Sequence, residues 1–151
     1  MDLKRFSYLV KALNMTSSDL RIFLTNYYDA IAFNDFLINN KCYLHARFDK
    51  PEFVEPYINY FKANGLDDLT IKNLIISIPI IFSVDDINKK LDVIYKDGEV
   101  EGVLIIDQNN EMHSYRLCNL NRSISESLYL LNNISLESDI ELKKSYYTKK
   151  H

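Results

Sequence analysis

Apolar residues recur at helical spacing through most of the first hundred positions of the chain. The first stripe has four members about one helical turn apart, Phe6, Leu9, Val10 and Leu13. This stripe predicts a helix from Leu3 to Leu13. Thr16 or Ser17 is suited to cap a second helix from about Ser18 to Leu24. A third helix is predicted from about Tyr27 to Ile38, with Thr25-Asn26 as the short turn before it.

Three further helices are predicted from the same period and from the residues that interrupt it. Residues 51–64 begin with a proline in the first turn and end before Gly65, which favours a left-handed cap. Residues 69–77 follow a cap at Asp67 or Asp68 and stop before Pro79. A capping box at residues 83–86 predicts a helix that continues to about Lys96.

The period of the pattern changes after Gly98. Residues 103–106 form a compact β-like run, residues 107–110 are turn formers, and residues 112–117 alternate as a strand does, so a β-hairpin is predicted. A second capping box at residues 123–126 predicts a final helix to about Asn132. The predicted fold class is therefore mainly α, of the α+β type. It comprises a helical N-terminal unit over 1–65, a helical and hairpin part over 66–142, and a basic tail over 143–151.

Composition predicts the cellular compartment of the protein. The chain has 151 residues, of which 47% are hydrophobic, and this is enough for a sizeable core without disulfides or metals. Its start carries no secretion signal, its apolar windows are too short to span a membrane, and it has two cysteines. These features predict a cytoplasmic protein in a reducing environment that does not interact with membranes.

The charge of the chain is divided unevenly along its length. Residues 1–50 carry a net +2, residues 51–142 a net −9 and residues 143–151 a net +4, within an overall charge of −3. Nucleic-acid-binding proteins usually carry a basic patch or stripe. The acidic body instead favours either a solvated surface or a surface that binds a basic protein.

The first three predicted helices resemble a Cro/repressor-type (XRE) helix-turn-helix. The stretch FSYLVKALN matches the family's first helix, TSSDLRIFL the positioning helix, TNYY the turn and DAIAFNDFLINNK the recognition helix. The match covers about the first forty to sixty residues. The chain departs from the family in lacking the small residue and the Gln usual early in the second helix. The resemblance implies a DNA-binding unit.

Candidates for nucleic-acid contact are the cations, amides and the aromatic residue on or beside these helices. They are Lys11, Arg21, Asn26, Tyr27, Asn34, Lys41 and Arg47. The predicted recognition helix carries Asp29 and Asp35 but no Lys or Arg, and carboxylates repel the phosphates on either side of a DNA groove. A small helical bundle that does not bind DNA is therefore an equal alternative.

Motifs for catalysis and metal binding are sparse. The chain lacks a Gly-rich phosphate loop, a G-x-S-x-G elbow and an H-E-x-x-H pair, so no enzyme activity and no cofactor are predicted. Cys42-x-x-His45 and His113-x-x-x-x-Cys118 would supply four zinc ligands. The second spacing is not that of a standard zinc knuckle. Buried cysteines and incidental histidines are therefore the favoured interpretation, and no metal is predicted.

Two functions follow from these observations. The first is a small DNA-binding regulator that forms a homodimer and whose C-terminal part mediates dimerisation or partner binding. The second is a non-catalytic module or inhibitor of a basic protein, similar in size and layout to small phage anti-CRISPR proteins. The acidic residues that would form its binding surface are Asp85, Asp86, Asp97, Glu99 and Glu101. The eleven tyrosines favour a protein partner or self-association.

Overall fold

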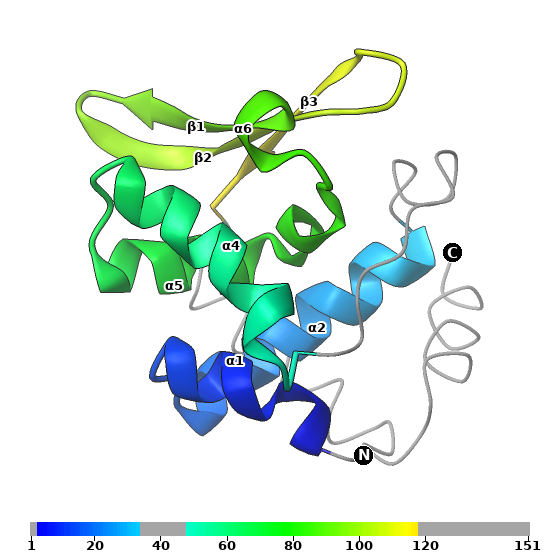
Figure 1. Cartoon of the computed structure of the whole chain (residues 1–151), viewed down its shortest axis with the longest axis vertical. Helices are drawn as coiled ribbons and strands as arrows, with labels where there is room; N and C mark the ends of the chain where they lie inside the picture. The colour runs from blue at the N-terminus through cyan, green and yellow to red at the C-terminus, as the bar shows by residue number, and fades with distance from the viewer. Residues whose placement is uncertain (1–2, 34–47, 118–151) are drawn as a thin grey trace.

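The fold was analysed in a computed structural model, which describes residues 3–33 and 48–117 (Figure 1). Its elements are η1 (Leu3–Phe6), α1 (Ser7–Ala12), α2 (Ser17–Phe33), α4 (Pro51–Ala63), α5 (Asp68–Ser77), η2 (Pro79–Ser83), α6 (Ile87–Lys90), β1 (Leu91–Lys96), β2 (Glu99–Ile106) and β3 (Met112–Arg116). The strands form one antiparallel sheet in the order β1-β2-β3. This arrangement confirms the predicted α+β class. The predicted final helix and the basic tail lie outside the described residues.

The sheet lies along one side of α4 and α5, and α1 and α2 lie on the other side of these two helices (Figure 1). Buried side chains from residues 6 to 105 form a single hydrophobic cluster, so the two predicted parts of the chain share one core. No helix among the described residues is both long and apolar enough to cross a membrane.

Helix α2 begins at a reciprocal capping box. The Thr16 backbone N–H donates to Asp19 Oδ2 at 2.9 Å, and the Asp19 N–H donates to Thr16 Oγ1 at 3.1 Å. This confirms the predicted cap, and it satisfies two N–H groups that have no partner within the helix. Asp19 Oδ2 also lies 3.0 Å from Lys72 Nζ, so the same carboxylate joins α2 to α5.

The predicted turn at Thr25-Asn26 is wrong, because α2 continues without interruption from Ser17 to Phe33. The Thr25 hydroxyl donates to the Arg21 carbonyl at 2.9 Å, a bond that a continuous helix accommodates. The Asn26 amide donates to the Ile76 carbonyl at 2.8 Å, at the end of α5. Both polar side chains thus have partners that leave the helix intact. The predicted positioning and recognition helices are one helix over their described residues.

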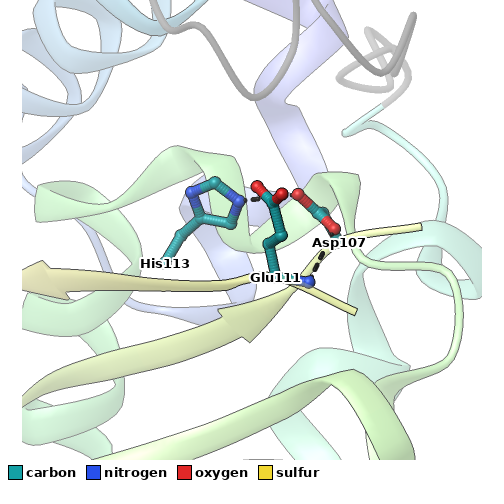
Figure 2. A group of neighbouring side chains, drawn as sticks. All are labelled: Asp107, Glu111 and His113. Carbon is teal, nitrogen blue, oxygen red and sulfur yellow. Dashed lines mark hydrogen bonds and ion pairs between the residues drawn. The ribbon is translucent and has the colours of Figure 1, made fainter. Parts of the chain in front are cut away.

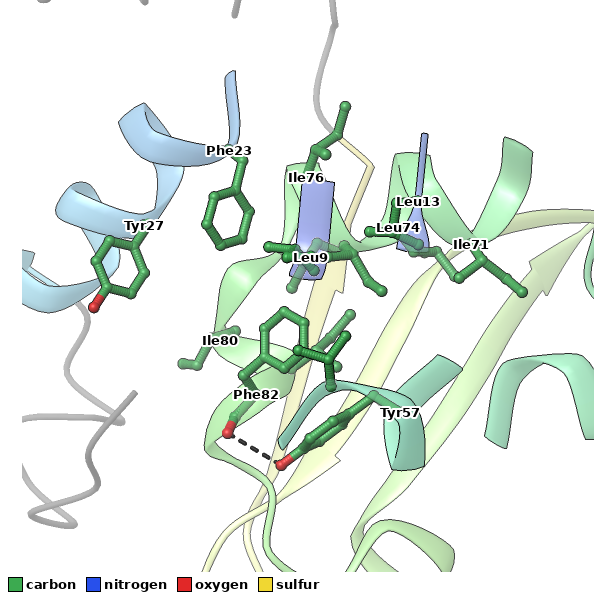
Figure 3. Packing of buried hydrophobic residues seen from close by; sticks show 14 of the residues in the cluster. Leu9, Leu13, Phe23, Tyr27, Tyr57, Ile71, Leu74, Ile76, Ile80 and Phe82 are labelled. Carbon is green, nitrogen blue, oxygen red and sulfur yellow. Dashed lines mark hydrogen bonds between the residues drawn. The ribbon is translucent and has the colours of Figure 1, made fainter. Parts of the chain in front are cut away.

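Aromatic rings hold α2 against the rest of the core. The ring of Phe48 stacks on Phe6 with centroids 5.6 Å apart, and it meets Phe82 edge to face at 4.9 Å. Phe23 and Tyr27 of α2 contact the rings of Phe6 and Phe48, and Figure 3 shows both side chains beside the buried cluster. Edge-to-face and offset ring pairs stabilise a core beyond the apolar area that they bury.

The short η2 turn lies inside the core, since Pro79, Ile80, Ile81 and Phe82 are all buried. The Tyr57 hydroxyl of α4 lies 3.1 Å from the Phe82 carbonyl and 2.7 Å from the Val84 carbonyl (Figure 3). Burial, with a smaller contribution from the charge of Asp85, raises the pKa of Tyr57 to about 12. The hydroxyl therefore keeps its proton and remains a donor to these carbonyls at physiological pH.

The sheet differs from prediction in its first strand. The β2–β3 hairpin is confirmed, with Val103 opposite Tyr115 and Ile105 opposite His113. The helix predicted from the capping box at residues 83–86 to Lys96 is wrong, because α6 ends at Lys90 and Leu91–Lys96 form β1. The Ser83 hydroxyl donates to the Ile80 carbonyl rather than capping α6. Strand β1 is fixed by its pairing with β2 across the Asp97-Gly98 turn, which the helical period of residues 83–96 does not contain.

We expect Asp19→Asn to lower the free energy of unfolding by about 1 kcal/mol at pH 7, because it removes the charged partner of Lys72. Burial raises the pKa of the Asp19 carboxyl, but Thr16 and Lys72 outweigh this and lower it overall. A lowered folded-state pKa means that the stabilisation is fully present above the unfolded pKa of about 3.9. It is lost as the pH falls through the folded value.

Urea unfolding of the two proteins between pH 7 and pH 2 measures this effect. The difference between wild type and Asp19→Asn should shrink steadily below about pH 4. Asp49→Asn, at an exposed position, is the matched control and should change little at any pH. A difference that persists undiminished to pH 2 would show that the charge of Asp19 is not its source.

We expect Tyr57→Phe to lower the free energy of unfolding by about 1–2 kcal/mol, because two buried carbonyls lose their donor while the ring packing is retained. Tyr95→Phe removes a hydroxyl from a half-exposed tyrosine and should change stability by less than about 0.5 kcal/mol. Chemical denaturation compares the two variants directly. Equal stabilities would exclude the Tyr57 hydroxyl as a determinant of the fold.

Candidate functional site

A groove of about 460 Å³ lies between the start of α5 and the tip of the β1–β2 hairpin. In Figure 1 this tip lies over the turn that joins α4 to α5. The groove is lined by residues of that turn, of α5, of the hairpin and of the end of β3. They are Gly65, Leu66, Asp67, Thr70, Asn73, Tyr95, Gly98, Glu99, Val100 and Leu117.

The helical wall of the groove is built by a helix end and a helix start in close succession. Gly65 has φ +84° and ends α4, which confirms the predicted left-handed cap. Asp67 then caps α5, and its Oδ1 accepts the Thr70 N–H at 2.8 Å. Hydrogen bonds from Thr70 hold the pKa of the Asp67 carboxyl below its usual value. Asp67 therefore presents a negative charge to the groove at neutral pH.

The opposite wall is the β1–β2 hairpin. Its turn consists of Asp97 and Gly98, both with positive φ, 54° and 82°, as tight hairpin turns of the I′ type require. The register shifts by one residue beside Tyr95, so that Tyr95 faces Val100 and Ile94 faces Gly102. This bulge leaves Glu101 outside the ladder and keeps Tyr95 and Val100 together on the groove side.

Charge in the groove is predominantly negative. Of its described lining residues, Asp67 and Glu99 are acidic and none is basic. The salt bridges formed within residues 3–33 and 48–117 involve neither of them, nor Asp97. Lys96 stands opposite Glu99 in the ladder and partly offsets the charge of the tip. The groove therefore favours a ligand that carries positive charge.

Exposed apolar side chains accompany these acids. Tyr95 lines the groove and is 53% exposed, and Leu69, in the first turn of α5, is 62% exposed. Tyr95 belongs to β1 and not to the helix predicted to continue to Lys96. Three tyrosines of the helices are used differently: Tyr27, Tyr28 and Tyr57 are buried.

The five predicted partner-binding acids do not form one surface. Glu99 lines the groove and Asp97 lies in the adjoining turn. Glu101 is paired with Arg116, whose Nε lies 2.8 Å from its Oε1. Asp85 and Asp86 are exposed before α6, where Asp85 lies 3.6 Å from Lys90 Nζ. Only the hairpin acids therefore contribute to the groove region.

The predicted nucleic-acid contacts differ in whether their side chains are accessible. Lys11 and Arg21 are exposed. Tyr27 is fully buried in the aromatic core, so its prediction as a DNA contact is wrong. The Asn26 amide is bonded to the Ile76 carbonyl, so it is not available to a base edge in this conformation. Asn34, Lys41 and Arg47 lie outside the described residues.

A second group of side chains lies at the far end of β2. Asp107, Glu111 and His113 place a carboxylate oxygen or a ring nitrogen within 4.8 Å of one another. His113 was predicted to be incidental or, with cysteines, a zinc ligand. In the structure its Nε2 lies 2.8 Å from Asp107 Oδ2. Cys42, His45 and Cys118, the other residues of the proposed zinc set, lie outside the described residues.

Comparisons with protein-family models, with curated proteins and with solved structures find no match to this chain. The helix-turn-helix resemblance is neither confirmed nor contradicted by a known relative.

One signal in the sequence could have located the groove. Asp97-Gly98 between alternating apolar residues is among the strongest short-range indications of a hairpin. Together with the predicted cap at Asp67, this dipeptide would have predicted two turns, each beside an acidic residue. Their proximity in space depends on packing between α5 and β2, which the local pattern does not contain.

Proposed function

We propose that this chain is a non-catalytic protein-binding module that binds a basic segment of a partner protein in the groove between α5 and the β1–β2 hairpin. The observation that carries this proposal is the lining of the groove, which presents Asp67 and Glu99, contains no basic residue among those described, and has the half-exposed Tyr95 on one wall.

The mixed character of the lining favours Lys or Arg side chains over other ligands. Such side chains have an apolar stem that packs on an aromatic or aliphatic surface and a charged head that binds carboxylates. Tyr95 and Val100 would contact the stem, and Asp67 and Glu99 the head. Pockets for neutral small molecules are lined mostly by apolar residues, whereas Thr70 and Asn73 add further polar groups here.

The DNA-binding hypothesis has less support than the protein-binding proposal. It relied on a separate recognition helix, and α2 provides no turn to create one within its described span. Lys11 and Arg21 are the exposed cations that remain of its candidate residues in the described part of the chain. Two surface cations give a weak electrostatic footprint, because affinity for DNA scales with the number of phosphates neutralised.

We expect the chain to bind a fluorescein-labelled deca-arginine peptide, and Glu99→Lys to weaken this binding about tenfold, or about 1.4 kcal/mol. The substitution places a positive charge where the peptide's cations would lie. Asp86→Lys changes the net charge by the same amount at an exposed position outside the groove. It should alter the affinity by less than about twofold.

Fluorescence anisotropy at about 0.15 M salt, where distant charges are largely screened, measures both affinities. Tyr95→Ala should also weaken binding, and this effect should persist at higher salt because it removes an apolar contact. Equal weakening by Glu99→Lys and Asp86→Lys would mean that the peptide responds to overall charge and not to the groove.

For duplex DNA we expect no salt-dependent binding even at about 50 mM salt, because the continuous α2 provides no separate basic recognition helix within residues 3–33 and 48–117. Titration of a random 20-base-pair duplex, followed by anisotropy, checks this. Binding that weakens with salt and is abolished by Lys11→Glu with Arg21→Glu would instead support a DNA-binding regulator and count against the present proposal.

A further inference from the structure

The loop that joins β2 to β3 gathers three potential metal ligands on one side. Figure 2 shows the side chains of Asp107, Glu111 and His113 directed toward one another. Asp107 follows the end of β2, Glu111 ends the loop and His113 lies in β3. Because one short hairpin supplies all three, their relative positions depend on local structure rather than on distant packing.

Asp107 is the fixed member of the group. It is only 3% exposed, and its Oδ1 accepts the backbone N–H groups of Asn109 at 2.8 Å and Glu111 at 3.0 Å. These two bonds orient the carboxylate so that Oδ2 faces His113 Nε2 at 2.8 Å. The hydrogen bond with His113 is the largest of the effects that hold the pKa of Asp107 below its usual value. The carboxylate is therefore ionised and preoriented.

Register explains why the ring reaches this carboxylate. His113 stands opposite Ile105, and both lie on the face of the sheet that carries Val103 and Tyr115. Asp107 comes two residues after Ile105, and successive odd positions of a strand lie on one face. The backbone turn is closed by the Asp107 N–H, which donates to the Glu111 carbonyl at 2.9 Å. This turn brings Glu111 back over the Asp107–His113 pair.

The position of the Glu111 carboxylate is not explained by a simple hydrogen-bonded turn. The turn is already complete with the two N–H bonds to Asp107 and the His113 contact. The carboxylate of Glu111 nevertheless approaches within 4.8 Å of both partners, although its residue is exposed and water is accessible to it. Two carboxylates at this separation repel each other, and a cation between them would remove that repulsion.

We propose that Asp107, Glu111 and His113 bind a divalent transition-metal ion of the Zn²⁺ type. Imidazole nitrogen together with carboxylate oxygen is a ligand set suited to Zn²⁺, whereas Mg²⁺ and Ca²⁺ prefer oxygen ligands alone. Ligands about 2.1 Å from one ion lie no more than about 4.2 Å apart. Binding an ion therefore requires His113 Nε2 and Asp107 Oδ2 to move apart from their present 2.8 Å, together with a rotation of the exposed Glu111 side chain. Water would complete the coordination.

Metal binding replaces the hydrogen bond between Asp107 and His113. The hydrogen shared by Nε2 and Oδ2 leaves Nε2, whose lone pair then binds the ion, and the proton is carried on Nδ1 or released to solvent. The backbone N–H groups on Asp107 Oδ1 remain in place and orient the ligand, as hydrogen bonds to metal-bound carboxylates commonly do.

This site is independent of the groove. Glu99 begins β2 and Ile106 ends it, so the eight residues of this strand separate the groove from the metal ligands. At about 3.3 Å per residue the two regions lie roughly 23 Å apart. A variant at one end therefore leaves the other unchanged, and failure of either proposal can be recognised separately.

The test uses the full chain without an affinity tag, after removal of metal by a chelator. Zn²⁺ is titrated by calorimetry, and thermal unfolding is recorded with and without the ion. We expect one Zn²⁺ per chain and a higher melting temperature with Zn²⁺ than with Mg²⁺ at the same concentration. Glu111→Gln should weaken Zn²⁺ binding at least tenfold. It should leave the melting temperature of the metal-free protein unchanged or slightly higher, because the Asp107–His113 bond remains and the repulsion between the two carboxylates is removed.

Two sets of control variants locate the ion. Glu101→Gln changes an acid elsewhere on β2 and should bind Zn²⁺ as the wild type does. Cys42→Ser, His45→Ala and Cys118→Ser should also retain binding. Zinc affinity that survives Glu111→Gln, or that is lost with Cys118→Ser, would overturn the proposal, as would the absence of saturable binding to the wild type. His113→Gln should abolish binding if the ring is a ligand.

Discussion

The fold depends on burying the peptide backbone between Ile76 and Val84. Buried carbonyl groups must find donors, because an unsatisfied one costs about 1–3 kcal/mol. The chain supplies these donors from three elements: Asn26 of α2 binds the Ile76 carbonyl, Tyr57 of α4 binds those of Phe82 and Val84, and Ser83 binds that of Ile80. With these bonds made, the apolar η2 turn can occupy the centre of the core. The aromatic rings of Phe48 and Tyr57 then close around Phe82.

This constraint explains where prediction from the sequence succeeded and where it failed. The helices at residues 51–64 and 69–77 were predicted correctly, because their own apolar period, prolines and caps determine them. The structure has α4 and α5 there. Asn26 was assigned to a turn and to DNA because it is polar, but its role is set by a carbonyl fifty residues away. Ser83 was assigned to a capping box for the same reason. A local pattern shows that a side chain is polar and does not show which distant group it serves.

The candidate sites were predictable to a similar extent. Glu99 was predicted to be an acidic surface residue and Asp67 a helix cap, and both line the groove. Tyr95 was placed on a helix, since its spacing of four residues from Leu91 also fits a helical stripe over a short window. At the other end of the sheet, the predicted strand and turn were correct. The approach of His113 to Asp107 required the register of β2 and β3, in which Ile105 faces His113.

Strand β2 gives the two candidate sites a common support. Its middle is held closely against β3, because a Cβ atom added at Gly102 would lie 1.9 Å from the Tyr115 carbonyl oxygen, so only glycine permits this approach. Its inward residues Val103 and Ile105 are fully buried in the core. The strand is therefore fixed along its centre, while its two ends carry exposed loops with acidic residues. The two ends differ in the groups that they offer: the groove has carboxylates beside an aromatic ring, and the β2–β3 loop has carboxylates beside an imidazole. The first pairing suits an organic cation with an apolar stem, and the second suits a transition-metal ion.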